Sequence, residues 1–156
     1  MRHIRRSALV ATSPQRMFEL INDVERYPEF VPACTAARVL EQNDEELHAE
    51  LTVGAGLLKT TFSTRNRLHP PERIEMRLES GPLKSLNGRW LLTPVTAGDV
   101  AGCRVELDLS FEAGGGLAAM TLGPVIERLA SSLVDAFVSR ARQERAAGRV
   151  PGARVS

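Results

Sequence analysis

The hydrophobic positions of this chain change their spacing twice, and the changes predict the order of its secondary structure. Residues 4–11 predict a first strand at a sheet edge. A helix follows, because Thr12 or Ser13 supplies an N-cap, Pro14 suits a first turn, and apolar residues then share one helical face. From residue 36 to 112 apolar and polar residues alternate, which is typical of antiparallel strands with one covered face. The predicted strands are residues 36–42, 46–53, 59–68, 73–80, 85–94 and 103–112.

The last predicted element is a long helix over residues 117–147, which follows three glycines and ends before Gly148 and Pro151. Its apolar residues recur at spacings of three and four. The sheet has one apolar face, and this helix is the only element large enough to cover it. We therefore predict an α+β helix-grip fold, in which a curved antiparallel sheet of about six or seven strands wraps around the C-terminal helix. Two short helices follow the first strand, residues 1–147 form one domain, and residues 148–156 form a flexible tail.

Composition narrows the functional classes. At 156 residues the chain fits one domain, and 43% hydrophobic with 25% charged residues is ordinary for a soluble globular protein. A formal net charge of +1 gives no reason to expect a DNA partner. Lys59 and Lys84 are the only lysines among the basic residues; the arginine bias fits phosphate or carboxylate contacts and equally a genomic base-composition effect. With no signal segment and no apolar run of ~20 residues, we predict a cytoplasmic protein, with peripheral contact at the inner membrane left open.

Residues that carry chemistry are sparse. The histidines are His3, His48 and His69, and none has a carboxylate or cysteine at metal-ligand spacing. Cys34 and Cys103 also lack such spacing and are interpreted as reduced, buried thiols. Neither a nucleophile elbow nor a phosphate-binding loop is present in the sequence. We therefore predict no metal, no catalytic residue, no required cofactor and no enzymatic activity.

One segment, residues 23–39 (DVERYPEFVPACTAARV), combines prolines with apolar and aromatic side chains. Two interpretations stay open: a lid packed over a ligand, or a corner packed on the core. In either case we expect Phe30 and Val31 to close the core and Tyr27 to lie nearer the mouth of a cavity.

Two motifs support a family resemblance. The sequence NDVERYPEFVPAC at residues 22–34 resembles the Tyr-Pro-x-Phe-x-Pro segment of the coenzyme Q-binding and RatA family, within the START-like (SRPBCC, Bet v 1-like) superfamily. The block SGPLKSLNGRW at residues 80–90 is similar to that family's Gly-Pro-aromatic-Lys-x-Leu-x-Gly-x-Trp pattern. The resemblance covers about residues 3–145. Ala33 stands where many members have Trp or Gly, and Leu83 where an aromatic residue is usual.

The resemblance implies several functions. Members related to the mitochondrial protein bind ubiquinone-like polyprenyl lipids and support respiration, and our first prediction is a non-enzymatic protein that binds such a quinone or another hydrophobic small molecule. The alternative is a RatA-type toxin that binds the large ribosomal subunit and blocks subunit association, which implies an antitoxin partner. A polyketide cyclase or aromatase is the third reading, and the absence of an acid/base set in the covered faces argues against it.

The predicted ligand site is the apolar space between the sheet and the last helix, although a filled core explains the same pattern. Its predicted apolar residues are Tyr27, Phe30, Val31, Phe62, Met76, Leu78, Trp90, Leu107, Leu109, Phe111, Leu122, Ile126, Leu129 and Leu133. The predicted polar or basic contacts are Arg65, Asn66, Arg77 and Lys84. Arg65, Arg67, Arg77 and Arg89 form either a patch for rRNA phosphate or anionic headgroups, or a solvated face interleaved with Glu75, Glu79 and Glu106.

Overall fold

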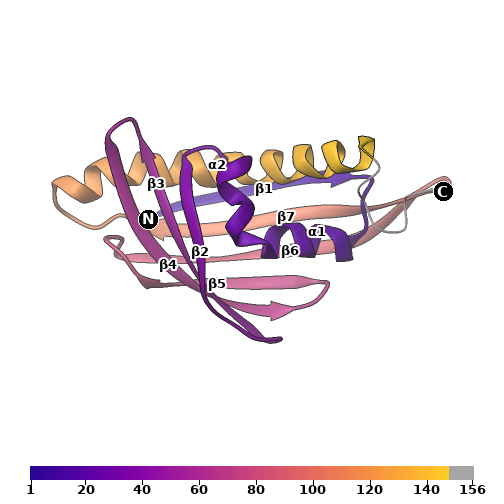
Figure 1. Ribbon diagram of the computed structural model, residues 1–156, viewed down its shortest axis with the longest axis horizontal. Helices are drawn as coiled ribbons and strands as arrows, with labels where there is room; N and C mark the ends of the chain where they lie inside the picture. Colours follow the sequence, from indigo (N-terminus) through magenta and orange to yellow (C-terminus); the bar gives the residue numbers. More distant parts are fainter. Residues whose placement is uncertain (148–156) are drawn as a thin grey trace.

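The computed structural model describes residues 1–147, apart from the side chains of residues 55, 118 and 119, and has the predicted order of elements (Figure 1). The predicted tail, residues 148–156, lies outside the described residues. The elements are β1 (Arg2–Val10), α1 (Pro14–Asn22), the 3₁₀ helix η1 (Val24–Glu29), β2 (Cys34–Gln42), β3 (Glu46–Ala55), β4 (Leu58–His69), β5 (Arg73–Ser80), β6 (Ser85–Ala97), β7 (Val100–Glu112) and α2 (Leu117–Ala146).

The strands form one antiparallel sheet of seven, in the order β1-β7-β6-β5-β4-β3-β2. Consecutive strands from β2 to β7 are neighbours, whereas β1 pairs with β7, from Arg2 opposite Phe111 to Val10 opposite Cys103. Helix α2 runs along β1 over one face of the sheet, which we call the inner face (Figure 1). The predicted helix-grip architecture is confirmed.

The short helices form where their sequence favours them. The Ser13 hydroxyl accepts a hydrogen bond from the backbone N–H of Arg16 at 3.1 Å and caps α1, and Pro14 occupies the first turn. Helix α1 buries Met17, Phe18, Leu20 and Ile21. Pro28 lies inside η1. A 3₁₀ helix this short makes few backbone hydrogen bonds, so it tolerates the missing N–H.

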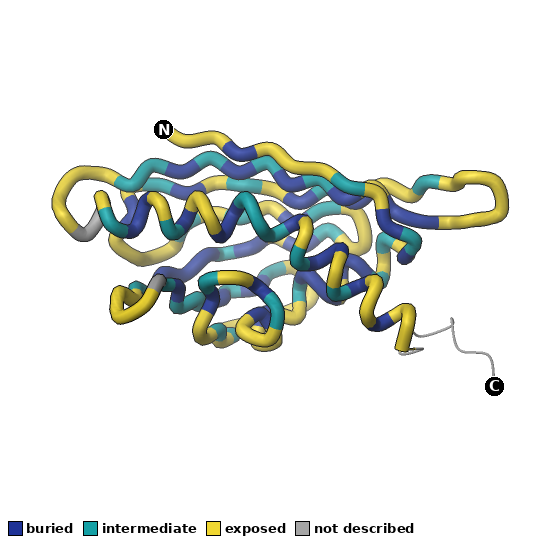
Figure 2. Tube along the Cα trace, turned by 90° about the horizontal axis from the view of Figure 1, so that it is seen from above, coloured by how far each residue is buried: buried dark blue, intermediate teal, exposed yellow. Residues whose placement is uncertain are grey.

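The alternation predicted for the strands is visible as burial (Figure 2). In β7 every second residue from Cys103 to Phe111 is buried, and the residues between them are exposed or half-buried. On α2 the buried stripe includes Leu122, Ile126, Leu129, Val134 and Phe137. Fully buried large side chains from both layers, among them Trp90 and Phe137, meet between helix and sheet. Burial of this apolar area is the main source of stability.

The structure shows the surroundings of Ala33 and Leu83, the two positions that depart from the resembled sequence pattern. Ala33 has φ 68°, in the left-handed region that glycine adopts without strain. Its carbonyl accepts a hydrogen bond from the Gly54 N–H at 3.0 Å, which anchors this turn to β3. Leu83 is buried and belongs to the core rather than to an opening.

Candidate functional site

A small cavity lies inside the grip, between the inner face of the sheet and α2, with a volume of about 60 Å³. It is lined by Val24, Tyr27, Ala49, Leu51, Phe62, Thr64, Asn66, Met76, Leu86, Trp90, Leu109, Ile126, Leu129, Ala130 and Leu133. Ligand pockets for organic molecules usually occupy ~300–1,000 Å³. In this conformation the cavity is therefore too small for a polyprenyl quinone.

Two polar side chains line this otherwise apolar space. Asn66 and Thr64 are both more than nine-tenths buried on β4, and their neighbours Arg65 and Arg67 point to the opposite face. The Oδ1 atom of Asn66 has no hydrogen-bond partner within residues 1–147. A buried amide oxygen without a partner costs ~1–3 kcal/mol. The cavity thus offers one acceptor to the O–H or N–H of an enclosed molecule.

Four aromatic rings form a cluster beside the cavity, and two of them, Tyr27 and Trp90, line it. The ring of Phe137 on α2 lies 5.2 Å from Tyr27, 5.2 Å from Phe30 and 5.4 Å from Trp90, each in an edge-to-face arrangement. The Tyr27 hydroxyl donates a hydrogen bond to the Ile21 carbonyl, and burial raises the pKa of Tyr27 above its ordinary value, so this phenol stays protonated.

The order of burial within the proline-flanked segment differs from expectation. Tyr27 is buried and lines the cavity, whereas Phe30 is half-buried and faces an outer cleft. Of the two residues expected to close the core, Val31 is buried and Phe30 is half-buried against it; Tyr27, expected nearer the mouth of a cavity, is itself buried at the cavity wall. The segment is a corner packed on the core, and the same corner forms one wall of the cavity.

The remaining predicted site residues are divided among several places. Phe62, Met76, Trp90, Leu109, Ile126, Leu129 and Leu133 line the cavity together with Tyr27 and Asn66. Val31, Leu107 and Phe111 are buried in the core, and Leu78 is packed against it, but none of the four lines the cavity. Leu122 lines a separate groove at the start of α2. The predicted set did not include six lining residues, namely Val24, Ala49, Leu51, Thr64, Leu86 and Ala130. The alternation of residues 46–53 already placed Ala49 and Leu51 on the covered face.

The predicted basic contacts lie outside the grip. Arg65 points to the outer face of the sheet, where Glu46 accepts a hydrogen bond at 2.5 Å and Glu79 another at 3.3 Å. The bonds to Glu46 and Glu79 raise the pKa of Arg65, and the bond from Arg65 lowers the pKa of Glu79. Arg77 pairs with Arg65 across the β4–β5 ladder. Lys84 precedes β6 and lies 3.4 Å from Glu112.

Acidic residues are interspersed among the basic ones over the outer face. One cross-strand row reads Glu46, Arg67, Glu75, Arg89, Asp108 and Arg5, so opposite charges face each other from strand to strand. Such pairing favours the interpretation as a solvated face over a continuous phosphate-binding patch.

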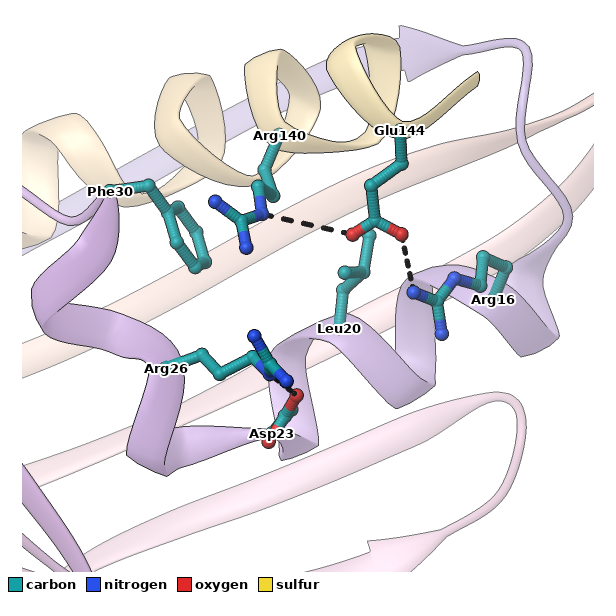
Figure 3. Close-up of a pocket in the computed structure, with 7 residues that line it drawn as sticks. All are labelled: Arg16, Leu20, Asp23, Arg26, Phe30, Arg140 and Glu144. Carbon is teal, nitrogen blue, oxygen red and sulfur yellow. Dashed lines mark hydrogen bonds and ion pairs between the residues drawn. The ribbon is translucent and has the colours of Figure 1, made fainter. Parts of the chain in front are cut away.

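A polar cleft of about 440 Å³ lies outside the aromatic cluster, between α1, η1 and the end of α2 (Figure 3). Its centre is Glu144, a nearly buried carboxylate that pairs with Arg16 on α1 and, at 3.7 Å, with Arg140 on its own helix. Arg140 also donates to Glu29 at 2.8 Å, and Arg26 pairs with Asp23. These ion pairs join the three helices. Because each cation already has an anion, the cleft is a structural junction.

Groups for acid–base or nucleophilic catalysis do not converge in the described residues. His3, His48 and His69 lie on the outer face, where they contact Asp108, Ser63 and Glu75 respectively. Burial raises the pKa of both Cys34 and Cys103 to about 11, which keeps these thiols protonated. Residues 1–147 contain no cluster of His, Cys, Asp or Glu suited to a metal ion. Within the same range, neither helix has the length and apolar content needed to cross a bilayer.

Comparison with known proteins agrees with this architecture. The model of the family described as "Polyketide cyclase / dehydrase and lipid transport" matches residues 10–138. The ribosome association toxin RatA of Pseudomonas aeruginosa is 47% identical over 141 residues, covering 90% of this chain and 96% of that protein. The mitochondrial coenzyme Q-binding protein coq10 of Schizosaccharomyces pombe is 29% identical over 143 residues, covering 88% and 85%.

Among solved structures, the Zhui aromatase/cyclase of Streptomyces sp. R1128 superimposes with a TM-score of 0.75 over 96% of this chain and 99% of that one, at 24% identity. At this identity the likeness shows the shared fold alone. The assignment of this chain to a family rests on the family model and on the RatA relative, each of which matches most of the chain. The chain therefore belongs to the polyketide cyclase/dehydrase and lipid transport family, among the members that include RatA.

Proposed function

We propose that this protein associates with the ribosome and acts as a RatA-type toxin on the large subunit. The observation that carries the proposal is the 47% identity to a ribosome association toxin, which extends over nearly the full length of both chains. The identity to the coenzyme Q-binding relative is 29%. Of our two predicted roles, the alternative is therefore the better supported one.

The geometry supports a binding role over a catalytic one. The two thiols are buried and protonated, the three histidines lie on the outer face, and the interior offers one unpaired amide oxygen in an apolar cavity. A protein with these features can act by binding to a surface of its partner, without catalysing a reaction.

Sedimentation tests the ribosome proposal. Purified protein is mixed with isolated large subunits, isolated small subunits and intact ribosomes, and each mixture is separated on a sucrose gradient. We expect the protein to co-sediment with large subunits, and added protein to lower the yield of joined ribosomes from free subunits. Absence from every ribosomal fraction, or unchanged joining at saturating protein, would contradict the proposal.

A second candidate function, binding of a hydrophobic molecule inside the grip, is favoured by one specific observation. The Oδ1 atom of Asn66 is buried and lacks a partner at the wall of a cavity between sheet and helix. An isoprenoid quinone or similar lipid that reaches this acceptor requires α2 and η1 to move apart, since the closed cavity measures about 60 Å³.

Native mass spectrometry of the protein purified with its lipids tests this second role. We expect a bound hydrophobic molecule in the wild type and its loss in Leu129→Trp, which fills the cavity. Asn66→Leu removes the acceptor and is expected to weaken binding, while Arg77→Ala, on the outer face, serves as the matched control. A wild-type protein that carries no lipid, and takes up none from quinone-containing micelles, would contradict it.

A further inference from the structure

One end of the molecule exposes large apolar side chains from two segments that lie far apart in the sequence. Leu57 and Leu58, at the turn between β3 and β4, are 101% and 60% exposed, and Leu117 and Met120, at the start of α2, are 83% and 73% exposed. We call these four residues the apolar end. Figure 2 shows both segments as exposed loops at the same end of the trace.

A groove of about 470 Å³ joins the two segments. Leu58 and Val53 line it on the hairpin side, and Leu117, Leu122 and Val125 line it on the helix side. It shares no lining residue with the interior cavity. The four residues of the apolar end thus flank a groove, and this groove is separate from the interior cavity.

The charges around the apolar end are positive or compensated. Lys59 follows Leu58 directly and makes no ion pair within residues 1–147. Lys84, the chain's other lysine, lies close to the loop before α2, because its backbone N–H donates to the Glu112 carbonyl at 2.9 Å. The nearby carboxylates of Glu112 and Glu127 are held by Lys84 and Arg2, respectively.

The backbone adds to this positive character. The first turn of α2 contains no acidic residue, and its N-cap, Gly116, offers no side chain to the free N–H groups. The positive end of the helix dipole is therefore not neutralised by the residues of its own first turn.

We propose that the apolar end docks on the surface of a bilayer that contains anionic lipids. Leu57, Leu58 and Leu117 enter the boundary between headgroups and acyl chains, and Lys59 contacts the lipid phosphates. Burial of the leucines and attraction between the lysine and the lipid phosphates both favour binding. The combination gives reversible attachment without a membrane-spanning segment.

Protrusion favours a bilayer over a folded protein as the partner. Leu57 is fully exposed at the tip of a hairpin, and the groove beside it lies between that hairpin and the start of α2. A fluid acyl layer fills around such tips, whereas a protein partner would need a complementary hollow for each.

Vesicle co-sedimentation tests the proposal with two sets of variants. The probes are vesicles of phosphatidylcholine alone and of phosphatidylcholine mixed with phosphatidylglycerol. The test variants are Leu57→Asp/Leu58→Asp, Leu117→Asp/Met120→Asp and Lys59→Glu. The matched controls are Leu9→Asp and Val100→Asp, because these apolar residues are 58% and 53% exposed outside the apolar end. Val100 lies in the β6–β7 hairpin at the opposite end of the molecule (Figure 1).

We expect the wild type to bind vesicles with phosphatidylglycerol and to be released by salt. Each double variant should weaken binding at least about tenfold and Lys59→Glu about fivefold, while both controls stay within about twofold of the wild type. All seven substitutions are at exposed side chains, so circular dichroism should report an unchanged fold.

Three results would overturn the proposal. The wild type could fail to bind vesicles with phosphatidylglycerol, it could bind both vesicle types equally, or the controls could lose binding as strongly as the test variants. Ribosome sedimentation of the same variants adds a separate readout. If the apolar-end variants no longer co-sediment with ribosomes and the wild type does not bind vesicles, this surface docks on a protein or RNA instead.

Discussion

The guanidinium carbon of Arg140 lies 5.0 Å from the centroid of the Phe30 ring, which joins the last helix to the proline-flanked segment that forms one wall of the cavity. The same guanidinium donates to Glu29 and pairs with Glu144. One side chain on α2 therefore holds η1 through a cation–π contact and an ion pair.

Replacing this cation should loosen the junction. Arg140→Met keeps the apolar stem but removes the contacts to Phe30, Glu29 and Glu144; Glu144 is then left with Arg16 as its partner. We expect a loss of about 1–2 kcal/mol in the free energy of unfolding, measured by urea denaturation. Arg142→Met is the matched control, since Arg142 is exposed and makes no ion pair within the described residues, and it should change stability by less than about 0.5 kcal/mol.

A glycine at position 33 should stabilise the protein. Ala33 has φ 68°, and a non-glycine residue in the left-handed region costs about 1–2 kcal/mol. Glycine removes that strain, but it also raises the entropy of the unfolded chain, which offsets part of the gain. We therefore expect Ala33→Gly to raise the free energy of unfolding by about 0.5–1 kcal/mol in thermal or urea denaturation. Ala36→Gly, three residues later within β2, should instead destabilise the sheet by a similar amount. A loss at both positions would show that the turn is not strained.

The Asp108 carboxylate should give the protein a specific sensitivity to acid. Hydrogen bonds from His3, and secondarily from Arg5, lower the pKa of Asp108 below its ordinary value. A carboxyl whose pKa is lowered by folding stabilises the folded state. This stabilisation is fully present above the pKa of the unfolded state, about 3.9, and is lost as the pH falls through the pKa of the folded state. We therefore expect Asp108→Asn to lower stability at neutral pH and to make the stability curve flatter below about pH 4. Parallel curves for the two proteins in that range would contradict the assignment.

The two thiols should be unreactive in the folded protein. Burial raises the pKa of Cys34 and Cys103 to about 11, so about one thiol in a thousand is ionised at pH 8. We expect Ellman's reagent to modify both cysteines at once on addition of denaturant and to leave them intact in native buffer. Rapid modification of one cysteine in the native state would identify a local opening at β2 or β7.

Much of the fold was predictable because each strand between residues 36 and 112 has one covered and one solvated face. The period-two pattern identified β7, whose buried residues alternate from Cys103 to Phe111, and the spacing of Leu122, Ile126 and Leu129 identified the covering helix. The pairing of β1 with β7 was not encoded in any local period. The architecture followed from burial, whereas the strand order was seen only in the structure.

The candidate site was less predictable, because periodicity assigns a residue to a face and does not reveal whether the space in front of it is filled. Leu107 and Leu109 share a face of β7, yet only Leu109 lines the cavity. The apolar end was missed altogether, because Leu57, Leu58 and Leu117 flank turns and belong to no repeating pattern. Asn66 was selected as a polar anchor, and the structure places its amide at the cavity wall.

The pairing of the first strand with the last also governs when this chain can fold. Arg2 lies opposite Phe111, so β1 has no neighbour in the sheet until translation has passed that residue, and α2 is made later still. Contacts between residues so distant in the chain make folding slow relative to helical proteins of this size. During synthesis the hairpins from β2 to β7 can form in succession, while the basic strand β1 stays unpaired until β7 is available. The N-terminus is thus translated first and joins the sheet last.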